Sequence, residues 1–197
     1  MTTLTKKLAF SGVAVALAAI TSNIRFFKLP MGGSVSLMSM LFICLVGCWF
    51  GLVWGMAAGV AFGLLQFVFD PYFLSVPQFF CDYIFSFASL GLAGFVHHVG
   101  ALKKHPLRLQ IGYLVGVFFR WVFAVISGVV FFASYAAEAG FDNPFLYSAA
   151  YNGSYIFAEA IITVIVISLP PVAKAINRIS YPLLDSSSSA SSSSSGA

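Results

Sequence analysis

Charge is what this sequence has least of. Of its 197 residues only 8% are charged, and six are acidic. An average globular chain is about a quarter charged, so this chain could not cover its surface with polar groups in water. Instead, 60% of its residues are hydrophobic and 22 are Phe. The composition excludes most soluble folds and indicates a chain that lies in a lipid bilayer.

Several chemical signatures are also absent. The cysteines Cys44, Cys48 and Cys81 lie in apolar segments without His or acidic residues at ligand spacing, so we expect buried thiols rather than a metal site or a disulfide. No Walker A motif is present, so any ATP hydrolysis must belong to partners. The net charge of +4 comes with no basic face interleaved with aromatic residues, so no nucleic-acid partner is expected. Nothing in the sequence indicates a resident cofactor.

Charge-free runs predict six membrane-spanning helices, each needing about 20 apolar residues. The run from Leu29 to Phe69 is too long for one span, so we divide it near Phe50 and Gly51. The expected fold class is an all-α membrane protein, with residues 1–181 forming one six-helix bundle. Residues 182–197, mostly Ser, are expected to be a disordered tail. The predicted spans are 8–24, 35–50, 52–68, 78–98, 109–133 and 150–172.

Basic residues set the expected orientation. Seven Lys and Arg fall in the ends and loops of one side, and the other side holds only Arg25 and Lys28. Basic loops stay in the cytoplasm, so both termini are predicted to be cytoplasmic, next to anionic lipid. The outer loops 28–34, 70–78 and 135–152 are rich in Pro, Gly, aromatic and polar residues. A binding site should therefore open outward.

Three ionisable residues fall within predicted spans, where each costs a few kcal/mol unless it is paired or faces a polar cavity. Arg120 and Glu159 lie about 18 and 16 Å deep on consecutive helices, so we expect them to form a structural ion pair. Asp82 is only about 8 Å deep and has no evident basic partner. It suits a cationic ligand, although local backbone, or Arg25 or Lys28 from the first outer loop, could satisfy it instead.

The last span carries a second set of polar groups. One is Asn152, which could bind a ligand or join helices. Two tyrosines, Tyr147 and Tyr151, flank the same entrance, whereas Tyr135 is expected in the aromatic belt at the lipid headgroups. Four polar residues recur at helical spacing and should point into the bundle: Ser148, Asn152, Tyr155 and Glu159.

Three segments together resemble the thiamine-specific substrate-binding subunit, or S component, of energy-coupling factor (ECF) transporters. They are KLPMGGSVSLMSMLF (28–42), PQFFCDYIFSFASLGLAGF (77–95) and YSAAYNGSYIFAEAIIT (147–163). The GGSVSL turn, an acidic residue and Tyr followed by an aromatic run and LGLAG, and a Y-x4-N pattern occur in that order. The resemblance covers nearly all of residues 8–180.

This resemblance implies a protein of the prokaryotic cell membrane that captures thiamine outside and delivers it inward. Its implied partners are a transmembrane coupling subunit and two ATPase subunits, and the chain itself would not be an enzyme. Thiamine is a permanent cation that joins a thiazolium to an aminopyrimidine. Such a ligand requires a carboxylate, stacking rings and an amide or hydroxyl, and the outward half of the chain supplies all three.

The resemblance also implies roles for individual residues. Asp82 would offset the thiazolium charge, and Ala14 with Ala18 matches an A-x-x-x-A surface that docks on the coupling subunit, for which packing within the bundle is the alternative. The chain departs from the family at Phe132 and Ala124, where a Trp and a His are common, and it lacks a first-loop Trp near Met31. The implied ligand-binding residues are Asp82, Tyr83, Tyr72, Phe132, Tyr147 and Asn152.

Other functions stay open at this stage. The chain could be an S component for another vitamin or for a pyrimidine or thiazole precursor. An intramembrane enzyme would need a second carboxylate beside Asp82, and Glu159 lies at a different depth. A channel or secondary carrier is disfavoured, because we find no internal repeat and no matched pair of broken helices.

Overall fold

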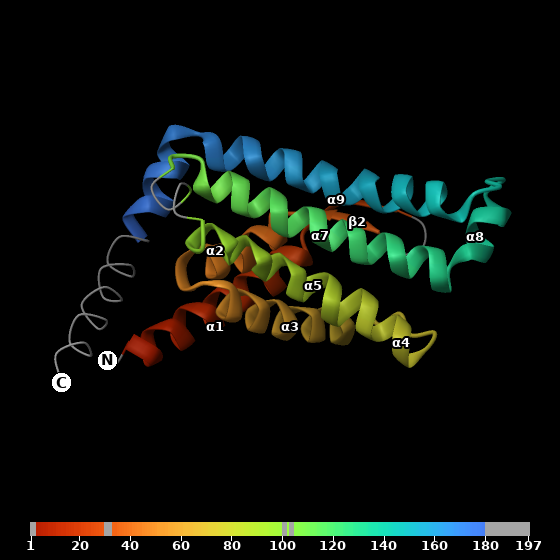
Figure 1. Cartoon of the computed structure of the whole chain (residues 1–197), viewed down its shortest axis with the longest axis horizontal. Coiled ribbons are helices and arrows are strands. Elements are labelled where there is room, and N and C mark those ends of the chain that lie inside the picture. The colour runs from red at the N-terminus through yellow and green to blue at the C-terminus, as the bar shows by residue number, and fades with distance from the viewer. Residues whose placement is uncertain (1–2, 30–32, 100–101, 103–104, 180–197) are drawn as a thin grey trace.

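The computed structural model describes residues 3–29, 33–99, 102 and 105–179, so the predicted tail lies outside the described residues. Within these residues, five helices have the length and apolar composition to cross a bilayer. They lie along the long axis of the molecule, and α1 begins at the end of the bundle where α9 finishes (Figure 1). The five are α1 (Thr3–Ser22), α3 (Leu52–Phe69), a composite helix (Val76–His97), α7 (Arg108–Phe131) and α9 (Pro144–Ser168).

A shorter apolar helix, α2 (Ser39–Phe50), completes the set of six. The predicted all-α bundle is thus confirmed. Gly51 separates α2 from α3 at the predicted place, and its φ of +93° is a conformation that suits glycine. The last helix begins earlier than the predicted residue 150, because the Asn143 side chain accepts hydrogen bonds from the backbone N–H groups of Phe145 and Leu146.

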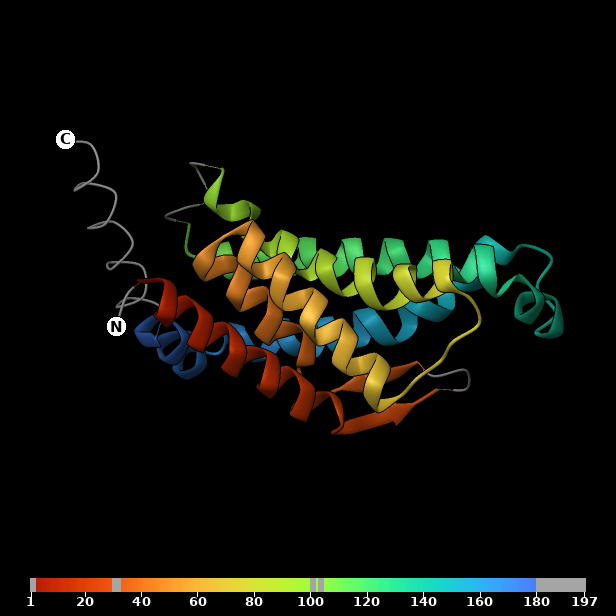
Figure 2. The same ribbon diagram turned by 90° about the horizontal axis from the view of Figure 1, so that it is seen from below.

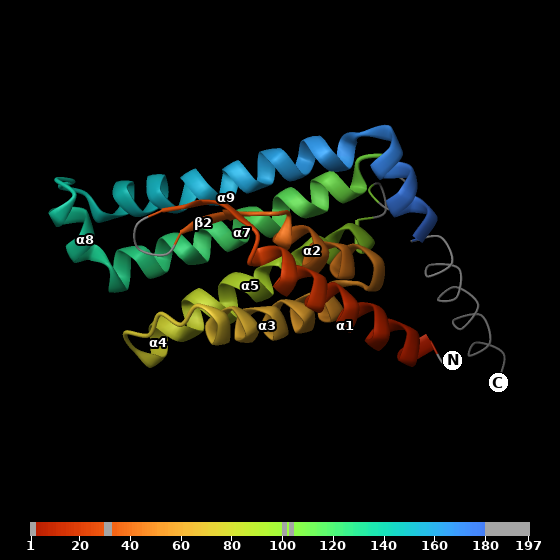
Figure 3. The same ribbon diagram turned by 180° about the vertical axis from the view of Figure 1, so that it is seen from behind.

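The segment before α2 is extended rather than helical. Strands β1 (Arg25–Lys28) and β2 (Ser34–Ser36) pair in antiparallel fashion, with Arg25 opposite Ser36. The predicted helical span 35–50 is therefore wrong in its first residues. With 12 residues, α2 is about 18 Å long, too short to cross a core of about 30 Å by itself. The hairpin lies beside α9 (Figure 3). It supplies the length that α2 lacks.

The composite helix is the most buried of the five long helices and packs against α2, α3 and α7 (Figure 2). It starts after Ser75, whose hydroxyl accepts a hydrogen bond from the Gln78 backbone N–H at 3.3 Å. Its first half is widened and its last part is tightened relative to an ordinary α-helix. Along the chain it comprises α4 (Val76–Phe79), η2 (Phe80–Phe85), α5 (Ser86–Ala88) and η3 (Ser89–His97).

Glycines let α3 approach this helix backbone to backbone. Gly55, Gly59 and Gly63 follow one another at four-residue intervals on α3, and each meets the backbone of the composite helix. Gly91 of η3 faces Gly55. A Cβ added at Gly91 would collide with the backbone nitrogen of Met56. Small residues at this spacing are typical of tightly packed membrane helices, where close van der Waals contact drives association.

Both alanines of the expected docking surface are buried. Ala14 is 8% exposed and Ala18 is fully buried, because this face of α1 packs against α2 and α3. The prediction that they form a surface for a coupling subunit is therefore wrong, and the alternative of packing within the bundle holds. The outward face of α1 carries larger apolar side chains, among them Val13 and Ile20.

The helix contact made by Gly91 gives a first prediction. Gly91→Ala should lower the free energy of unfolding by about 1–3 kcal/mol, because the new methyl group meets the rigid backbone of α3. The matched control is Gly12→Ala on α1, where no atom lies within 4 Å of the added Cβ. Thermal unfolding in detergent should show a lower melting temperature for Gly91→Ala alone. Equal melting temperatures for the two variants would contradict this packing.

Candidate ligand-binding site

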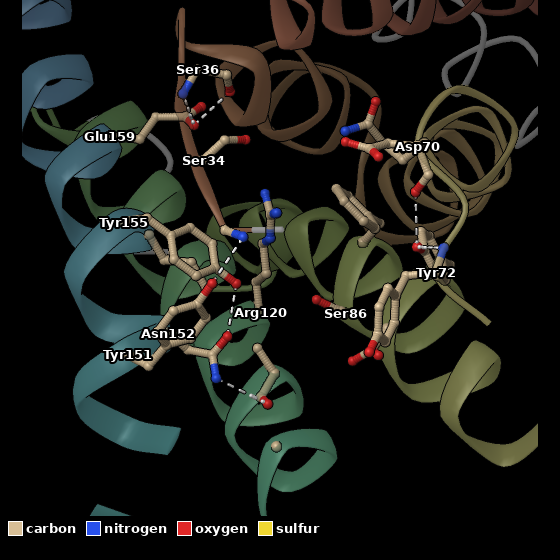
Figure 4. Close-up of a pocket in the computed structure, with 18 of the residues that line it drawn as sticks. Ser34, Ser36, Asp70, Tyr72, Ser86, Arg120, Tyr151, Asn152, Tyr155 and Glu159 are labelled. Atoms are coloured by element: carbon tan, nitrogen blue, oxygen red, sulfur yellow. Dashed lines mark hydrogen bonds between the residues drawn. The ribbon is translucent and has the colours of Figure 1, made fainter. Parts of the chain in front are cut away.

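A cavity of about 250 Å³ lies between the hairpin, α3, the composite helix, α7 and α9 (Figure 4). It reaches the end of the bundle that carries the 70–75 loop and α8 (Ala133–Glu138), where a site was expected. Its volume is slightly below that of sites for drug-sized ligands, roughly 300–1,000 Å³. The six residues predicted to bind a ligand all line it: Asp82, Tyr83, Tyr72, Phe132, Tyr147 and Asn152.

Asp82 lies in η2 on the cavity wall, and the Gln78 side chain orients it. Its Oδ2 accepts a hydrogen bond from Nε2 of Gln78, one turn earlier. Gln78 is fully buried, and it also donates to the Tyr72 carbonyl and accepts from the Leu74 N–H. Gln78 was not predicted from the sequence, although an amide four residues before an acid in an apolar span is a usable signal. Gln78 fixes both the carboxylate and the loop above it.

The cations of the first outer loop pair with a different acid. Arg25 Nη1 lies 2.7 Å from Asp70 Oδ2, and Lys28 Nζ lies 3.9 Å from the same atom. Among the residues that the structure describes, no ion pair involves Asp82. The alternative in which Arg25 or Lys28 neutralises Asp82 is therefore not observed. The Asp82 carboxylate remains available to a cation in the cavity.

Tyr83 holds the loop that follows α3. Its hydroxyl accepts a hydrogen bond from the Tyr72 backbone N–H at 3.0 Å and donates to the Asp70 carbonyl at 3.2 Å. Its ring stacks on Phe79 with centroids 5.8 Å apart. Tyr83 thus lines the cavity and also sets the position of Tyr72.

Three rings meet at the outer part of the cavity. Tyr72 and Phe132 have centroids 5.6 Å apart, and Phe132 stacks on Tyr135 at 5.8 Å with planes 18° apart. The hydroxyl oxygens of Tyr72 and Tyr135 are 2.7 Å apart and share a hydrogen bond, which with partial burial raises the pKa of Tyr72 to about 12. Tyr135 was expected among the lipid headgroups, but it lines the cavity, because α8 brings it back beside Phe132.

The polar face of α9 points into the cavity as predicted. The Tyr155 hydroxyl donates to Asn152 Oδ1 at 2.7 Å, and Asn152 Nδ2 donates to Ser148 Oγ at 3.1 Å and to the Ala124 carbonyl of α7 at 3.4 Å. Asn152 therefore joins α9 to α7 and also lines the cavity. Both roles considered for it from the sequence are compatible with this geometry.

Glu159 caps the junction between the hairpin and α2. Its carboxylate, only 3% exposed, accepts hydrogen bonds from the Ser36 N–H and hydroxyl, the Ser39 hydroxyl and the Met40 N–H. The first turn of α2 has no side-chain cap of its own, and Met38 before it has a φ of +53°. A carboxylate at a helix N-terminus is stabilised by the unpaired N–H groups and by the helix dipole.

The predicted ion pair between Arg120 and Glu159 is wrong. Among the described residues no ion pair joins them, because the hairpin and α2 occupy the Glu159 carboxylate. The Arg120 guanidinium instead lies 4.3 Å from the centroid of the Phe87 ring. Its Nε has no hydrogen-bond partner in the described part of the chain. Figure 4 shows Arg120 between the tyrosines of α9 and the side that carries Tyr72.

The hairpin is also tied to α9 closer to the mouth of the cavity. The Gly33 N–H donates a hydrogen bond to the Tyr151 hydroxyl at 3.0 Å. A Cβ at Gly33 would lie 2.7 Å from the Tyr155 ring, so a larger residue would push the strand away. Gly33 and Ser36 therefore anchor the hairpin along two turns of α9.

Comparison with known proteins agrees with this architecture. The family model described as Thiamine transporter protein (Thia_YuaJ) matches residues 8–178. The chain belongs to this family. Thiamine transporter ThiT of Bacillus subtilis (strain 168) is 34% identical over 171 residues, which cover 83% of this chain and 87% of that protein. The solved structure of ThiT from Listeria monocytogenes has a TM-score of 0.66 and 22% identity, over 84% of this chain and 94% of that one.

Membership of the thiamine transporter family confirms the resemblance found in the sequence. The structural match supports the helical bundle as a fold. The family description and the named relative are those of transporters, which agrees with the prediction that the chain is not an enzyme. With its apolar helices, the protein is a multi-pass membrane protein of a transport family.

The capping role of Glu159 gives a prediction for stability. Glu159→Gln should lower the free energy of unfolding by about 1–3 kcal/mol, because the amide N–H₂ group cannot accept the hydrogen bonds that the carboxylate receives. Glu138→Gln, at the end of α8, is the control and should change stability little. Thermal unfolding in detergent measures both. A Glu159→Gln variant as stable as its control would refute the capping role.

Proposed function

We propose that this protein is the substrate-binding subunit of a thiamine uptake transporter in a prokaryotic cell membrane. It takes thiamine from the outer side and delivers it inward together with an ECF coupling subunit and two ATPases. The observation that carries this proposal is a carboxylate without a cationic partner in the described residues, Asp82, in the wall of an aromatic-lined cavity. Family membership supports the choice of ligand.

The charges of the cavity suit a ligand with one cationic end. The thiazolium ring carries a fixed positive charge, so it is attracted both to the Asp82 carboxylate and to the faces of nearby aromatic rings. In a site screened from water these attractions are stronger than in solution. The Arg120 guanidinium, whose residue also lines the cavity, repels a cation. We therefore expect the thiazolium to bind near Asp82 and Tyr83.

The other half of thiamine, an aminopyrimidine, matches the groups of α7 and α9. The Phe132 ring can stack on the pyrimidine, with Tyr147 beside the same entrance. Asn152 already uses its amide N–H₂ on Ser148 and Ala124, but within the described part of the chain its Oδ1 accepts only the Tyr155 hydroxyl. An amide oxygen can accept two hydrogen bonds. The second would come from the exocyclic amine of the pyrimidine.

Delivery inward requires an energy source that this chain does not contain, since it has no Walker A motif. We expect thiamine to bind first, with the hairpin closing over it. Partner subunits would then drive reorientation of the loaded bundle. The buried Ala14 and Ala18 leave the surface that meets the coupling subunit to other residues.

Removing the charge of Asp82 tests the ligand and its anchor together. Asp82→Asn should weaken thiamine binding by about 100-fold, or about 2.7 kcal/mol, because the neutral amide no longer attracts the thiazolium. Calorimetric titration of the detergent-purified protein without partners measures this. The control is Asp142→Asn, an exposed acid after α8, which should bind like the wild type.

The same titration has two contradicting outcomes. If the wild type gives no heat of binding with thiamine, the thiamine assignment is wrong and another vitamin or precursor is favoured. Unchanged affinity in Asp82→Asn would show that the cation is held elsewhere. A melting curve of each variant separates loss of binding from loss of folding.

Reconstitution in lipid vesicles tests the need for partners. The protein alone should bind thiamine in proportion to its amount but should not accumulate it, whereas addition of the coupling subunit, the ATPases and ATP should produce uptake. Radiolabelled thiamine inside the vesicles is the readout. Accumulation by the protein alone, driven by an ion gradient, would identify a secondary carrier instead.

A further inference from the structure

Tyr135 occupies a position that the proposed function does not yet use. It lies in the first turn of α8, three residues after Phe132, and its N–H donates to the Phe132 carbonyl at 3.1 Å. It is half-buried and lines the cavity. An aromatic residue that only anchored the protein at the lipid headgroups would expose its ring to lipid and its hydroxyl to water. Tyr135 instead directs both toward neighbouring side chains.

Its contacts join two separate loops into one aromatic group. The planes of Phe132 and Tyr135 are within 18° of each other, and Tyr72 leans on Phe132 at 39°. The hydrogen bond between the Tyr72 and Tyr135 hydroxyls closes the triangle. Removal of Tyr135 would therefore take away one ring and free a second.

We propose that Tyr135 is a specificity-determining residue of the ligand site: its ring packs against Phe132 and fixes the orientation of that ring, and its hydroxyl holds Tyr72 in place. The ligand class is a flat, cationic heteroaromatic molecule. The inference rests on the proposed function, because it takes thiamine as that molecule. It adds a residue to the site that neither the sequence pattern nor the family match assigns.

The physical reason is the orientation of the stacking surface. Phe132 presents one six-membered ring, and the strength of stacking grows with the area that two rings share. The nearly parallel Tyr135 ring packs against Phe132 and keeps it from tilting away from a ligand. A larger side chain at position 132, which offers more area of its own, should therefore make Tyr135 dispensable.

Four variants test this by thiamine titration in detergent: Tyr135→Leu, Phe132→Trp, the double variant, and Phe145→Leu as the control. Phe145 is an exposed aromatic residue at the same end of the bundle that does not line the cavity. Tyr135→Leu should weaken binding roughly tenfold, because it removes an interaction energy equal to that of about one aromatic pair. The double variant should recover most of that loss, and Phe145→Leu should bind like the wild type. Tyr135→Phe, which removes only the hydroxyl, should show a smaller loss and serves if Tyr135→Leu fails to fold.

The outcomes separate this inference from the proposed function. If the wild type binds thiamine and Tyr135→Leu binds as tightly, Tyr135 is an interfacial anchor and the inference is overturned alone. If Tyr135→Leu binds weakly and Trp at position 132 restores nothing, the role of Tyr135 in supporting the stacking ring at position 132 is overturned. If the wild type does not bind thiamine, the proposed function fails and this inference fails with it.

Discussion

The outer half of this bundle depends on how the chain satisfies the backbone groups between β2 and α2 inside a membrane. Lipid offers no acceptor there, so every N–H group at a break in a helix needs one from the protein or from water in a cavity. The Glu159 carboxylate supplies it for Ser36 and Met40. With that junction stabilised, a short helix and a hairpin can replace a full helical span. The hairpin then forms one wall of the cavity, and Gly33 and Tyr151 hold it against α9.

The small number of charged residues also explains the character of the cavity. The chain contains few ionisable residues, and each one near the cavity has a separate environment. Asp70 holds the cations of the hairpin, and Glu159 holds the junction. Arg120 is stabilised by the face of Phe87. Asp82, oriented by Gln78, is the carboxylate that remains available to a cation. The proposed ligand is therefore cationic.

Much of this could be predicted from composition and spacing, because a bilayer restricts the chain to few solutions. Apolar runs predicted the helices, and the helical spacing of the polar residues on α9 correctly predicted its inward polar face. Local sequence could not show the hairpin, since Ser34 to Ser36 are as compatible with a helix entrance as with a strand. The error at Arg120 and Glu159 followed from it: the competing donors for Glu159 come from a segment that was expected to be helical.

Burial of Ala14 and Ala18 was equally undetermined, because one small-residue face serves an internal or an external helix contact. Tyr135 was misplaced because the turn into α8 leaves no clear signal in the sequence.

The most direct test of the central claim is an experimental structure of the protein with thiamine bound. We expect the thiazolium within about 5 Å of the Asp82 carboxylate, a separation at which opposite charges still attract strongly, and the aminopyrimidine between Phe132 and Asn152. Arg120 should lie on the far side of the ligand from the thiazolium. Thiamine bound outside this cavity, or in it with the thiazolium beside Arg120 and away from Asp82, would contradict the account.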